Sequence, residues 1–491
     1  MRSMRKKLSN KIINQIKLME IEEAKSLGRS ARRKEQTRLR KKYNDKSIKI
    51  LNNKTFKKGE EFNREQRRNV CKNKNLLIEV VKIITKYLPI LLPLIDKLTD
   101  KRHKSYVTYS IRTIILTRLF SLICGVTSMN GMTRKFNKTN AIKNLSSICK
   151  QKLIEIPHWQ TIQDVIEQLD IEEIRNIRKY IVKTLVRSKM FDNARYNGAF
   201  QLLVDATGVS SHSYNLNNTC ISKKSKKGIM KYYKYVLEAK IIVGNIVISL
   251  DSEWIENSII KTEKQKQDCE INAFKRMATR IKKEFPKMKF IITGDALYAT
   301  NPTIDICKKN NWNYIFNLKK DRLKQVFNDF EDDLAYENET TEEDYFLSTK
   351  IKYKAHNLNA VRYQEYQEEK LVTFNYITNL KTNNHNIKKI VKMGRKRWKI
   401  ENEGFNEQKN GTFCISHLSS RNENAIKIHY YLIQIAHIIR QLLEQGSIIL
   451  REMKLQKKEV SEHIQNAFTS TNSDLNVIET NFQLRFDNLI I

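Results

Sequence analysis

The spacing of apolar residues changes along the chain and separates regions of different predicted structure. From about residue 75 to 195, apolar residues recur every three or four positions, which predicts buried helices. Two examples are LLIEVVKIITKYLPILLPLIDKL and the run from Ile114 to Val126. Further apolar stripes comprise Ile162, Val165, Ile166 and Leu169, and then Ile174, Ile177, Ile181 and Leu185. This region is predicted to be a bundle of helices.

After residue 198 the helical spacing gives way to β-branched runs. AFQLLVDATG, YKYVLEAKIIV and NIVISLDSEWI are typical of strands, and Gly244-Asn245 between the last two is a hairpin signal. A helix is predicted from about Glu263 to Phe285. The strand KFIITGD, a short helix NPTIDICKKN with Pro302 in its first turn, and the strand WNYIFNL follow. This order predicts a mixed α/β sheet.

The pattern changes again after residue 330. EDDLAYENETTEED is predicted to be an acidic loop, and DYFLSTKIKY, AVRYQEYQ and KLVTFNYITN are predicted strands of a β insertion. A single helix is expected from Asn386 to Asn410. The segment IKIHYYLIQIAHIIRQLLEQG is predicted to be a long amphipathic helix that ends at Gly446. Residues 447–491 show only a weak pattern.

The charge of the chain narrows the class of partner. Its 91 Lys and Arg outnumber 53 Asp and Glu, so the net charge is +38, and residues 1–50 alone hold 17 basic against 5 acidic residues. Such an excess favours a polyanionic partner, nucleic acid before an anionic membrane. For the net charge, the alternative is a proteome whose proteins are generally basic and rich in Lys and Asn. For residues 1–50, the alternative is a solvated tail.

The seven cysteines and the apolar runs exclude other classes. The cysteines lie singly and none has zinc-site spacing, which is typical of a reducing compartment. No apolar run is long enough to cross a bilayer, and the start of the sequence lacks the apolar core of a signal peptide. We therefore expect a cytoplasmic protein with no membrane partner.

Three carboxylates are candidates for chemistry. Asp205 and Asp295 follow predicted strands in VDATG and TGDAL, which would place both at the rim of the sheet. Glu401 lies in the very basic stretch GRKRWKIENEGFNEQKN. Three such oxygen ligands suit Mg²⁺, and two ions about 4 Å apart can activate a nucleophile and stabilise the leaving oxygen of a phosphodiester. The simpler alternatives are turn and cap roles for the aspartates and a surface pair of Arg397 with Glu401, worth about 0.3–0.5 kcal/mol.

Several stretches in fixed order resemble a known family. They are LLVDATGV, KQDCEINAFKRMATRIKKEFPKMKFIITGDALYA, FNYITNL, GRKRWKIENEGFNEQKN and HLSSRNENAIKIHYYLIQIAH. Over roughly residues 110–445 the chain resembles bacterial insertion-sequence transposases of the DDE class. The resemblance implies an α/β fold: an RNase H-like mixed sheet with flanking helices and a β-rich insertion, preceded by a helical N-terminal region. It also implies that Asp205, Asp295 and Glu401 are the catalytic triad and the ligands of two Mg²⁺ ions, for which Mn²⁺ can substitute.

The resemblance extends to domains and partners. The expected organisation is a basic arm that is partly disordered or helical (1–75), a helical DNA-binding region (76–195), an RNase H-like catalytic domain (196–329 and 384–446), a β-strand insertion (330–383) and a C-terminal tail (447–491). The expected partner is double-stranded DNA, both transposon ends and target, bound by a homodimer or higher oligomer. In a bacterial cell the DNA-bound protein would then lie at the nucleoid.

The last helix of the family typically carries the pattern Tyr-x-x-Arg-x-x-x-Glu-x-x-x-x-x-x-Lys. Arg397 and Glu401 fit it, whereas Gly394 stands at the tyrosine position and Gln408 at the lysine position. Arg397 and Lys409, one residue beyond the expected lysine, are the predicted phosphate-binding side chains. Arg397 and Glu401 are four residues apart and share a helix face, which favours Glu401 over Glu403 as the third ligand.

A second basic segment, KKSKKGIMKYYKYV, mixes lysines with tyrosines. Its lysines suit DNA phosphates and its tyrosines suit base stacking, but an exposed sheet edge protected by lysines would look the same. The DNA-binding candidates here are Lys223, Lys224, Lys226 and Lys227. His212, His417 and His437 are expected to be loop, packing or capping residues, and Trp312 a core residue.

The leading functional hypothesis is a transposase that binds terminal inverted repeats, cleaves DNA with metal-activated water and joins the freed 3′-hydroxyl to target DNA. The alternative is a catalytically decayed or co-opted DNA-binding protein derived from a transposase. A third possibility is an RNase H-fold nuclease without strand transfer.

Overall fold

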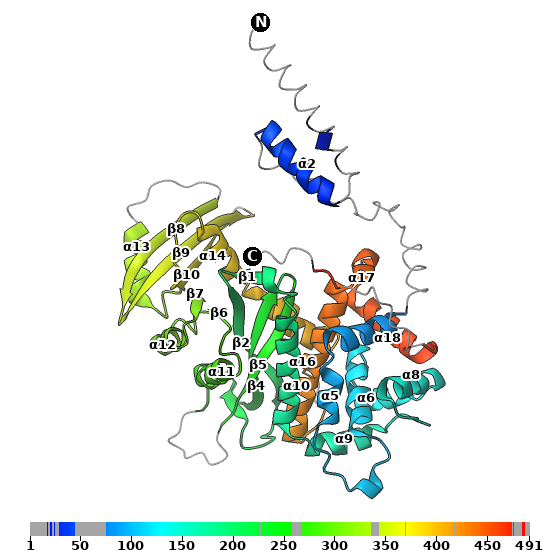
Figure 1. Ribbon diagram of the computed structural model, residues 1–491. Coiled ribbons are helices and arrows are strands. Elements are labelled where there is room, and N and C mark those ends of the chain that lie inside the picture. Colours follow the sequence, from blue (N-terminus) through cyan, green and yellow to red (C-terminus); the bar gives the residue numbers. More distant parts are fainter. Residues whose placement is uncertain are drawn as a thin grey trace. The chain divides into compact units, whose positions relative to one another are not determined.

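The computed structural model divides the chain into two units, Met1–Lys74 and Asn75–Ile491 (Figure 1). The described residues are 17, 20, 21, 24, 29–44, 75–225, 227–257, 267–334, 343–368, 370–416, 419–473, 475 and 484–486. In the first unit, helix α2 (Arg29–Lys42) buries Leu39 against Ala24, and Tyr43 and Lys42 both bond to Glu20. Part of the basic arm is therefore helical.

The second unit begins with the predicted helices. They are α4 (Leu76–Lys82), the π-helix η1 (Ile83–Tyr87), α5 (Leu91–Asp96), the short 3₁₀ turn η2 (Lys104–Tyr106), α6 (Ile111–Ile123), α7 (Met129–Phe136), α8 (Thr139–Cys149), α9 (Trp159–Gln168) and α10 (Ile171–Arg187). The two predicted apolar stripes fall on α9 and α10 and are buried. Asp170 separates these helices, because its side chain caps the first turn of α10.

Helix α16 (Glu423–Gly446) is the central element of this helical region. It was predicted to be amphipathic, and that prediction is wrong, because nearly every residue from Ala425 to Leu443 is buried. The helix is covered by α6, α9 and α10 and by strand β5 (Ile246–Ile255). The polar side chains that suggested a solvent-facing side, among them Gln434, His437 and Arg440, are buried and hydrogen-bonded inside the protein.

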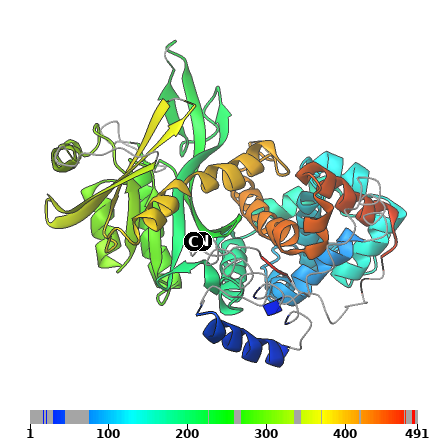
Figure 2. The ribbon, with the colours of Figure 1, turned by 90° about the horizontal axis from the view of Figure 1, so that it is seen from above.

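Two C-terminal helices complete the unit: α17 (Ile448–Met453) and α18 (Lys457–Ser470). The weak sequence pattern did not indicate them. Helix α18 contacts α8 and α4, and its Phe468 is fully buried against Phe120 and Phe136. The red helices therefore lie with the blue and cyan helical region beside the sheet (Figure 2).

The described strands form one ten-stranded mixed sheet, which confirms the predicted α/β class. They are β1 (Arg195–Tyr196), which follows the 3₁₀ turn η3 (Asp192–Ala194), β2 (Ala199–His212), β3 (Ile221–Lys224), β4 (Met230–Val243), β5, β6 (Phe290–Gly294), β7 (Asn313–Asn317), β8 (Glu343–Tyr353), β9 (His356–Gln367) and β10 (Lys370–Thr378). The order is β3-β4-β2-β6-β7-β10-β9-β8, with β5 beside β4 and β1 beside β2. The β4–β5 hairpin turns at Gly244-Asn245, as predicted.

Helices cover both faces of the sheet. Helices α11 (Glu270–Glu284) and α12 (Asn301–Lys309) lie on one face, where Phe274 contacts Tyr298 and Phe290 contacts Trp312, a buried core residue as predicted. Helix α14 (Ile387–Arg395) lies on the other face, over Ile291 and Ile315. Pro302 occupies the first turn of α12, as predicted. Helix α11 was predicted from about residue 263 but begins at Glu270; residues 267–269 are not helical and 258–266 lie outside the described residues.

The predicted insertion strands exist, and they extend the main sheet. Strand β10 pairs antiparallel with β7, so β8, β9 and β10 continue the same ladder. The segment from residue 331 was predicted to begin a loop, but its first residues end helix α13 (Lys324–Leu334). Buried Val326 and Phe330 supply the apolar face that the acidic sequence obscured.

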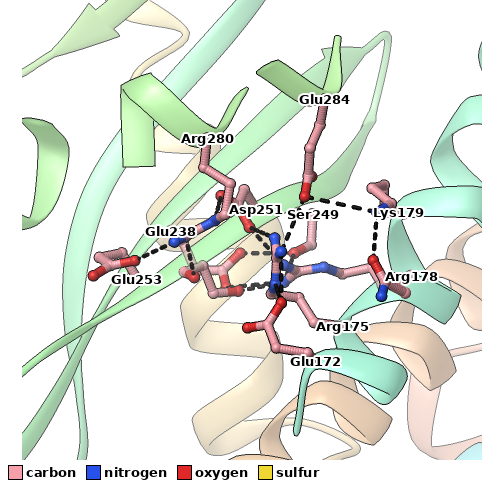
Figure 3. Close-up of polar contacts among 12 residues, drawn as sticks. Glu172, Arg175, Arg178, Lys179, Glu238, Ser249, Asp251, Glu253, Arg280 and Glu284 are labelled. Carbon is pink, nitrogen blue, oxygen red and sulfur yellow. Dashed lines mark hydrogen bonds and ion pairs between the residues drawn. The ribbon is translucent and has the colours of Figure 1, made fainter. Parts of the chain in front are cut away.

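A layer of buried charge lies between α10, α16 and strands β4 and β5 (Figure 3). Asp251 pairs with Arg178 at 3.1 Å and with Arg280 at 2.8 Å. Glu238 accepts hydrogen bonds from Tyr430 at 2.6 Å and Ser249 at 2.9 Å. We call this set the buried ion network; Asp251, Glu238 and Arg178 are buried, and Arg280 is partly exposed.

Candidate active site

Asp205 and Asp295 come from neighbouring parallel strands. The parallel pairing of β2 with β6 ends at Leu203 and Thr293, so both aspartates lie just past the end of the shared ladder. The strand was predicted to end within AFQLLVDATG, at Asp205 to Gly208, but β2 continues to His212 by pairing with β4. Asp205 nevertheless lies at the rim of the sheet on the side of β6, because the pairing of β2 with β6 ends at Leu203 and Thr293.

The loop after β6 is closed tightly around Asp295. The carboxylate of Asp295 accepts the backbone N–H of Leu297 at 2.8 Å, and its carbonyl accepts the N–H of Tyr298. Tyr298 is fully buried under this turn. A Cβ at Gly294 would lie 2.7 Å from the Tyr298 ring, so glycine at this position lets the ring pack below the strand end.

The site is acidic and partly buried. Burial raises the pKa of Asp205 to about 7; the positive charge of Arg397 opposes this rise, and the negative charges of Glu270 and Asp295 add to it. Asp205 therefore carries its negative charge in the field of two further carboxylates. Carboxylates that share a site disfavour each other's ionisation unless a cation joins them.

Glu270 was not anticipated from the sequence. It is the first residue of α11, and its carboxylate accepts a hydrogen bond from the Tyr298 hydroxyl at 3.3 Å. Burial, and next the charge of Asp295, raise the pKa of Glu270. An acidic residue in the first turn of a helix is ordinary, so only its place beside the strand ends distinguishes it.

Arg397 joins Asp205 to the predicted third carboxylate. Its Nη1 donates to Asp205 Oδ2 at 3.4 Å, and its Nη2 lies 3.9 Å from Glu401 Oε2. The predicted shared face of Arg397 and Glu401 is thus present. The predicted continuous helix is not: α14 ends at Arg395, a turn follows, and Glu401 lies in the π-helix η4 (Ile400–Asn406), which leads into α15 (Glu407–Asn410).

The π-helix has a physical anchor. Ile400 and Phe405 pack on Leu203, Ile242 and Val247, so η4 is pressed onto the sheet beside Asp205. Single π-turns often mark functional sites, because the wider turn redirects side chains. Glu403 is directed elsewhere: it pairs with Lys399 at 3.1 Å and does not contact Arg397.

The tertiary structure shows the surroundings of Gln408, which stands where the family pattern has a lysine. Gln408 is fully buried and donates hydrogen bonds to Gln434 at 2.8 Å and to His437 at 2.9 Å. Lys409, the next residue, is only partly buried; burial lowers its pKa, and the charges of Asp205 and Glu401 oppose this shift. The structure also explains why glycine stands at position 394. A Cβ there would lie 2.5 Å from the ring of Tyr376 in β10, so a side chain at this position would clash with that ring.

The lysines of the β3–β4 hairpin have mixed outcomes. Lys223 donates to the hydroxyl of Tyr235 at 3.1 Å, lies over the Tyr233 and Tyr235 rings, and lowers the pKa of Glu270 by its charge. Lys224 and Lys227 are exposed, and Lys226 lies outside the described residues. Strand β3 is at the edge of the sheet, so the edge-protection interpretation also remains open.

The expected loop position of His212 is wrong, because this residue ends strand β2, whereas His437 is a packing residue as expected. His212 bonds to Ser210 near the far end of β2, and His437 is buried in α16; His417 lies outside the described residues.

An aromatic and basic groove adjoins the site. It has a volume of about 550 Å³ between α14, η4 and the strands β8 and β9. Its lining includes Lys388, Lys392, Arg395, Lys396, Lys399 and Trp398. Trp398 is 54% exposed, which is unusual for so large an apolar ring. The sequence placed a tryptophan in the basic stretch but did not indicate that it would face solvent.

The candidate site offers the type of ligand atom, carboxylate oxygen, that a hard divalent cation prefers. Oε2 of Glu401 is buried and has no hydrogen-bond partner among the described residues. Asp205, Asp295, Glu270 and Glu401 supply only carboxylate oxygens, the ligand type that Mg²⁺ prefers. Within the described ranges, no three His, Cys, Asp or Glu side chains are gathered closely enough to bind one metal ion as they stand.

The α/β sheet with acidic residues past its parallel strands is that of an RNase H-like domain. Residues 255–466 match the family model of transposase DDE domain group 1. This match confirms the resemblance to DDE transposases of the insertion-sequence type and supports a general function in transposition. The matched range contains Asp295, Glu401 and Lys409; Asp205 precedes it.

No curated protein matches this chain in sequence. In the part of the chain that the structure describes, no helix is both long and apolar enough to span a bilayer.

Proposed function

We propose that the protein is a DNA transposase that binds the inverted repeats at the ends of its element, cleaves the DNA and joins the freed 3′ end to a target. The observation that supports the proposal is that Arg397 contacts Asp205 and lies 3.9 Å from Glu401, at the sheet rim where Asp295 follows the neighbouring parallel strand. These residues come from three separate segments of the chain, and the match to a transposase DDE domain covers two of those segments.

Divalent cations are the general cofactor of DDE transposases, and Asp205, Asp295 and Glu401 are the residues that would hold them. Two bound ions would supply activation of the attacking hydroxyl and stabilisation of the leaving oxygen. The protein's own contribution is to keep three carboxylates at one rim with few internal partners. Such a group is costly without a cation, and therefore selects for one.

Arg397 and Lys409 would have two roles. Without DNA, their charges offset those of Asp205 and Glu401. With DNA bound and the carboxylates satisfied by cations, both side chains become available to a phosphate, and the guanidinium of Arg397 can bind two phosphate oxygens together.

The groove beside η4 is the DNA surface that the structure favours. Its lysines provide sequence-independent contacts to phosphates, and exposed Trp398 provides a ring on which a base can stack. The guanidinium of Arg397 lies over the same ring at 4.6 Å and holds it in place.

The test uses full-length protein and a duplex that carries the end of its element, in Mg²⁺. Strand cleavage and joining are followed on gels for the wild type, Asp205→Asn, Asp295→Asn and Glu401→Gln. We expect cleavage and joining by the wild type and neither by the variants. Undiminished cleavage in any variant contradicts the assignment of that residue.

The same assay separates the other candidate functions. Salt-dependent binding without cleavage by the wild type would indicate a non-catalytic DNA-binding protein. Cleavage without joining would indicate a plain nuclease of the same fold.

A further inference from the structure

The hairpin of β3 and β4 continues past the rim of the sheet at which Asp205 lies, and green strands extend beyond their neighbours in Figure 2. Strand β6 pairs with β2 only as far as Leu203, whereas β4 pairs with β2 as far as His212. Met230, at the last paired position of the hairpin, lies eight positions along β4 from Glu238, the residue opposite Asp205. At about 3.3 Å per residue, the hairpin ends roughly 25 Å along the strand from Asp205.

The turn at the end of this hairpin is closed by local hydrogen bonds. The backbone N–H of Gly228 donates to the carbonyl of Ser225 at 2.9 Å, and the N–H of Ser225 donates to the carbonyl of Ile229 at 2.8 Å. The hydroxyl oxygen of Ser225 accepts the N–H of Ile229 at 3.1 Å. These bonds fix the backbone at Ile229 and Met230, the two residues that we call the hairpin tip.

The hairpin tip is apolar and exposed. Ile229 is 57% exposed and Met230 is 40% exposed. Protection of a sheet edge accounts for exposed lysines on β3, but it gives no reason for two adjacent apolar side chains beside a turn, where polar residues and glycine are usual. Single exposed apolar residues are common, whereas a pair at the end of a projecting hairpin indicates contact with a partner.

The surroundings of the tip identify the chemistry of that partner. The stretch from Ile221 to Tyr235 contains no Asp or Glu. Exposed lysines flank the tip on both strands and in the turn: Lys223, Lys224, Lys227 and Lys231. Behind them the rings of Tyr233 and Tyr235 stack 5.4 Å apart. An apolar tip inside a ring of positive charge fits a polyanion with an apolar interior, and stacked bases between two phosphate chains form such an interior.

We propose that the β3–β4 hairpin inserts Ile229 and Met230 between bases of the bound DNA, while the flanking lysines bind the phosphates. Apolar wedges of this kind partly unstack a base step and bend the duplex. The inference rests on the proposed function, from which it takes DNA as the partner. Because the tip and Asp205 lie on the same pair of strands, the unstacked step should fall within about one helical turn, roughly 34 Å, of the cleaved phosphate.

The test measures base unstacking by 2-aminopurine fluorescence. Full-length protein is bound to a duplex that carries the end of its element, with 2-aminopurine at successive positions from the cleavage site, in a chelator so that no metal-dependent cleavage occurs. We expect the wild type to raise the fluorescence at one or two adjacent positions and the double variant Ile229→Ser/Met230→Ser to abolish the rise. Leu371→Ser is the matched control, because Leu371 is also an exposed apolar residue beside a hairpin turn, between β9 and β10, and should leave the rise unchanged.

The lysines have a separate readout, the dependence of DNA affinity on salt. Lys224→Gln/Lys227→Gln should lower the slope of log affinity against log salt by about 1.8, since each phosphate contact contributes about 0.9. Lys308→Gln/Lys309→Gln is the control: these exposed lysines end α12, which leads into the start of β7, at the end of the parallel strands opposite Asp295. Its slope should equal that of the wild type, and equal slopes in both double variants would contradict the phosphate contacts.

Other occupants of the tip give different results. If the tip contacts a second copy of the chain, Ile229→Ser/Met230→Ser changes the sedimentation of the protein without DNA. If it enters an anionic membrane, the same variant loses binding to phosphatidylserine vesicles. Either result, with the fluorescence rise intact, overturns the inference.

Failure of the inference is distinguishable from failure of the proposed function. A wild type that cleaves and joins DNA in Mg²⁺ but raises no fluorescence, or a tip variant that keeps the rise, overturns the inference and leaves the function. A rise that depends on the tip, without cleavage in Mg²⁺, supports the inference and contradicts the catalytic function. A wild type that does not bind the duplex overturns both.

Discussion

Two groups of carboxylates in this protein have opposite surroundings: one is buried beside cationic and hydroxyl partners, and the other lies at the partly exposed rim of the sheet. In the buried ion network, Asp251 has Arg178 and Arg280 as partners, and Glu238 has Tyr430 and Ser249 (Figure 3). At the rim of the sheet, Asp205 shares one arginine with Glu401, and both Asp205 and Asp295 are close to Glu270. A buried charge is tolerated when it is paired and hydrogen-bonded, so the network serves the fold. The incompletely paired rim is arranged for a ligand.

The largest expected effect concerns function at the rim. Asp295→Asn should lower DNA cleavage by at least about a thousandfold, equivalent to about 4 kcal/mol of lost transition-state stabilisation. Its free energy of unfolding should be unchanged or higher, because a repulsive charge is removed. Cleavage rates and urea denaturation of the same preparation check both parts, and a marked loss of stability would place Asp295 with the network.

The converse experiment concerns Asp251. Asp251→Asn should lower the free energy of unfolding by about 3–5 kcal/mol, because Arg178 and Arg280 lose a buried counter-charge. Urea denaturation in a chelator measures this loss without a contribution from metal. A stable variant that loses only cleavage would contradict the division between the two groups.

A substitution at Gln408 tests whether a buried position close to the catalytic stretch serves the fold or the chemistry. Gln408→Lys would restore the lysine of the family pattern, yet its side chain would enter a fully buried site beside Gln434 and near Lys240, which bonds to the same Gln434 at 3.0 Å. We expect a loss of about 3 kcal/mol of stability and no gain in cleavage. Lys409→Ala is the matched control and should reduce cleavage with little change in the urea midpoint.

The buried helix α16 should make stability depend on pH. Burial holds the pKa of His429 and His437 well below the ordinary 6.5; Arg118 adds to this for the first, and Lys240 for the second. Below pH 6.5 the unfolded chain binds protons that the folded chain does not, so each histidine should reduce stability by about 1.4 kcal/mol per pH unit as the pH falls. Urea denaturation at several pH values should show a shallower decline in His437→Gln, and the difference between the two slopes isolates this histidine. Equal slopes would contradict the prediction.

The smallest effect separates the two acids of the π-helix. Glu403→Gln removes a partly exposed pair with Lys399, so it should cost less than about 0.5 kcal/mol of stability and leave cleavage within about twofold. Glu401→Gln in the same assay should abolish cleavage. Equal losses in the two variants would show that the rim is not specific to Glu401.

The alternation of apolar residues was sufficient to predict the helices before residue 195, the β4–β5 hairpin and the strands of the insertion, because these patterns reflect which side chains are buried. It was not sufficient for α16, because the polar residues of that helix are buried against internal partners and do not face solvent. It also misplaced the end of β2, since a strand end depends on where the neighbour β6 stops and not on the residues of β2 alone.

The residues of the candidate site likewise divide into those that the sequence predicted and those that it missed. Asp205, Asp295 and Glu401 were predicted from local sequence and from the resemblance, and the structure places Arg397 between Asp205 and Glu401. Glu270 and Trp398 were missed. Neither belongs to a pattern in its own segment, and each acquires its place from contacts with residues far away in the chain.

By itself the sequence determined the class of fold, the excess of positive charge and the residue types available for a phosphodiester chemistry, because composition and periodicity are properties of single segments. Only the tertiary structure decided which carboxylates are paired and which face one another. That choice depends on the packing of α10, α11, η4 and α16 against one sheet, and on the exclusion of water that this packing brings.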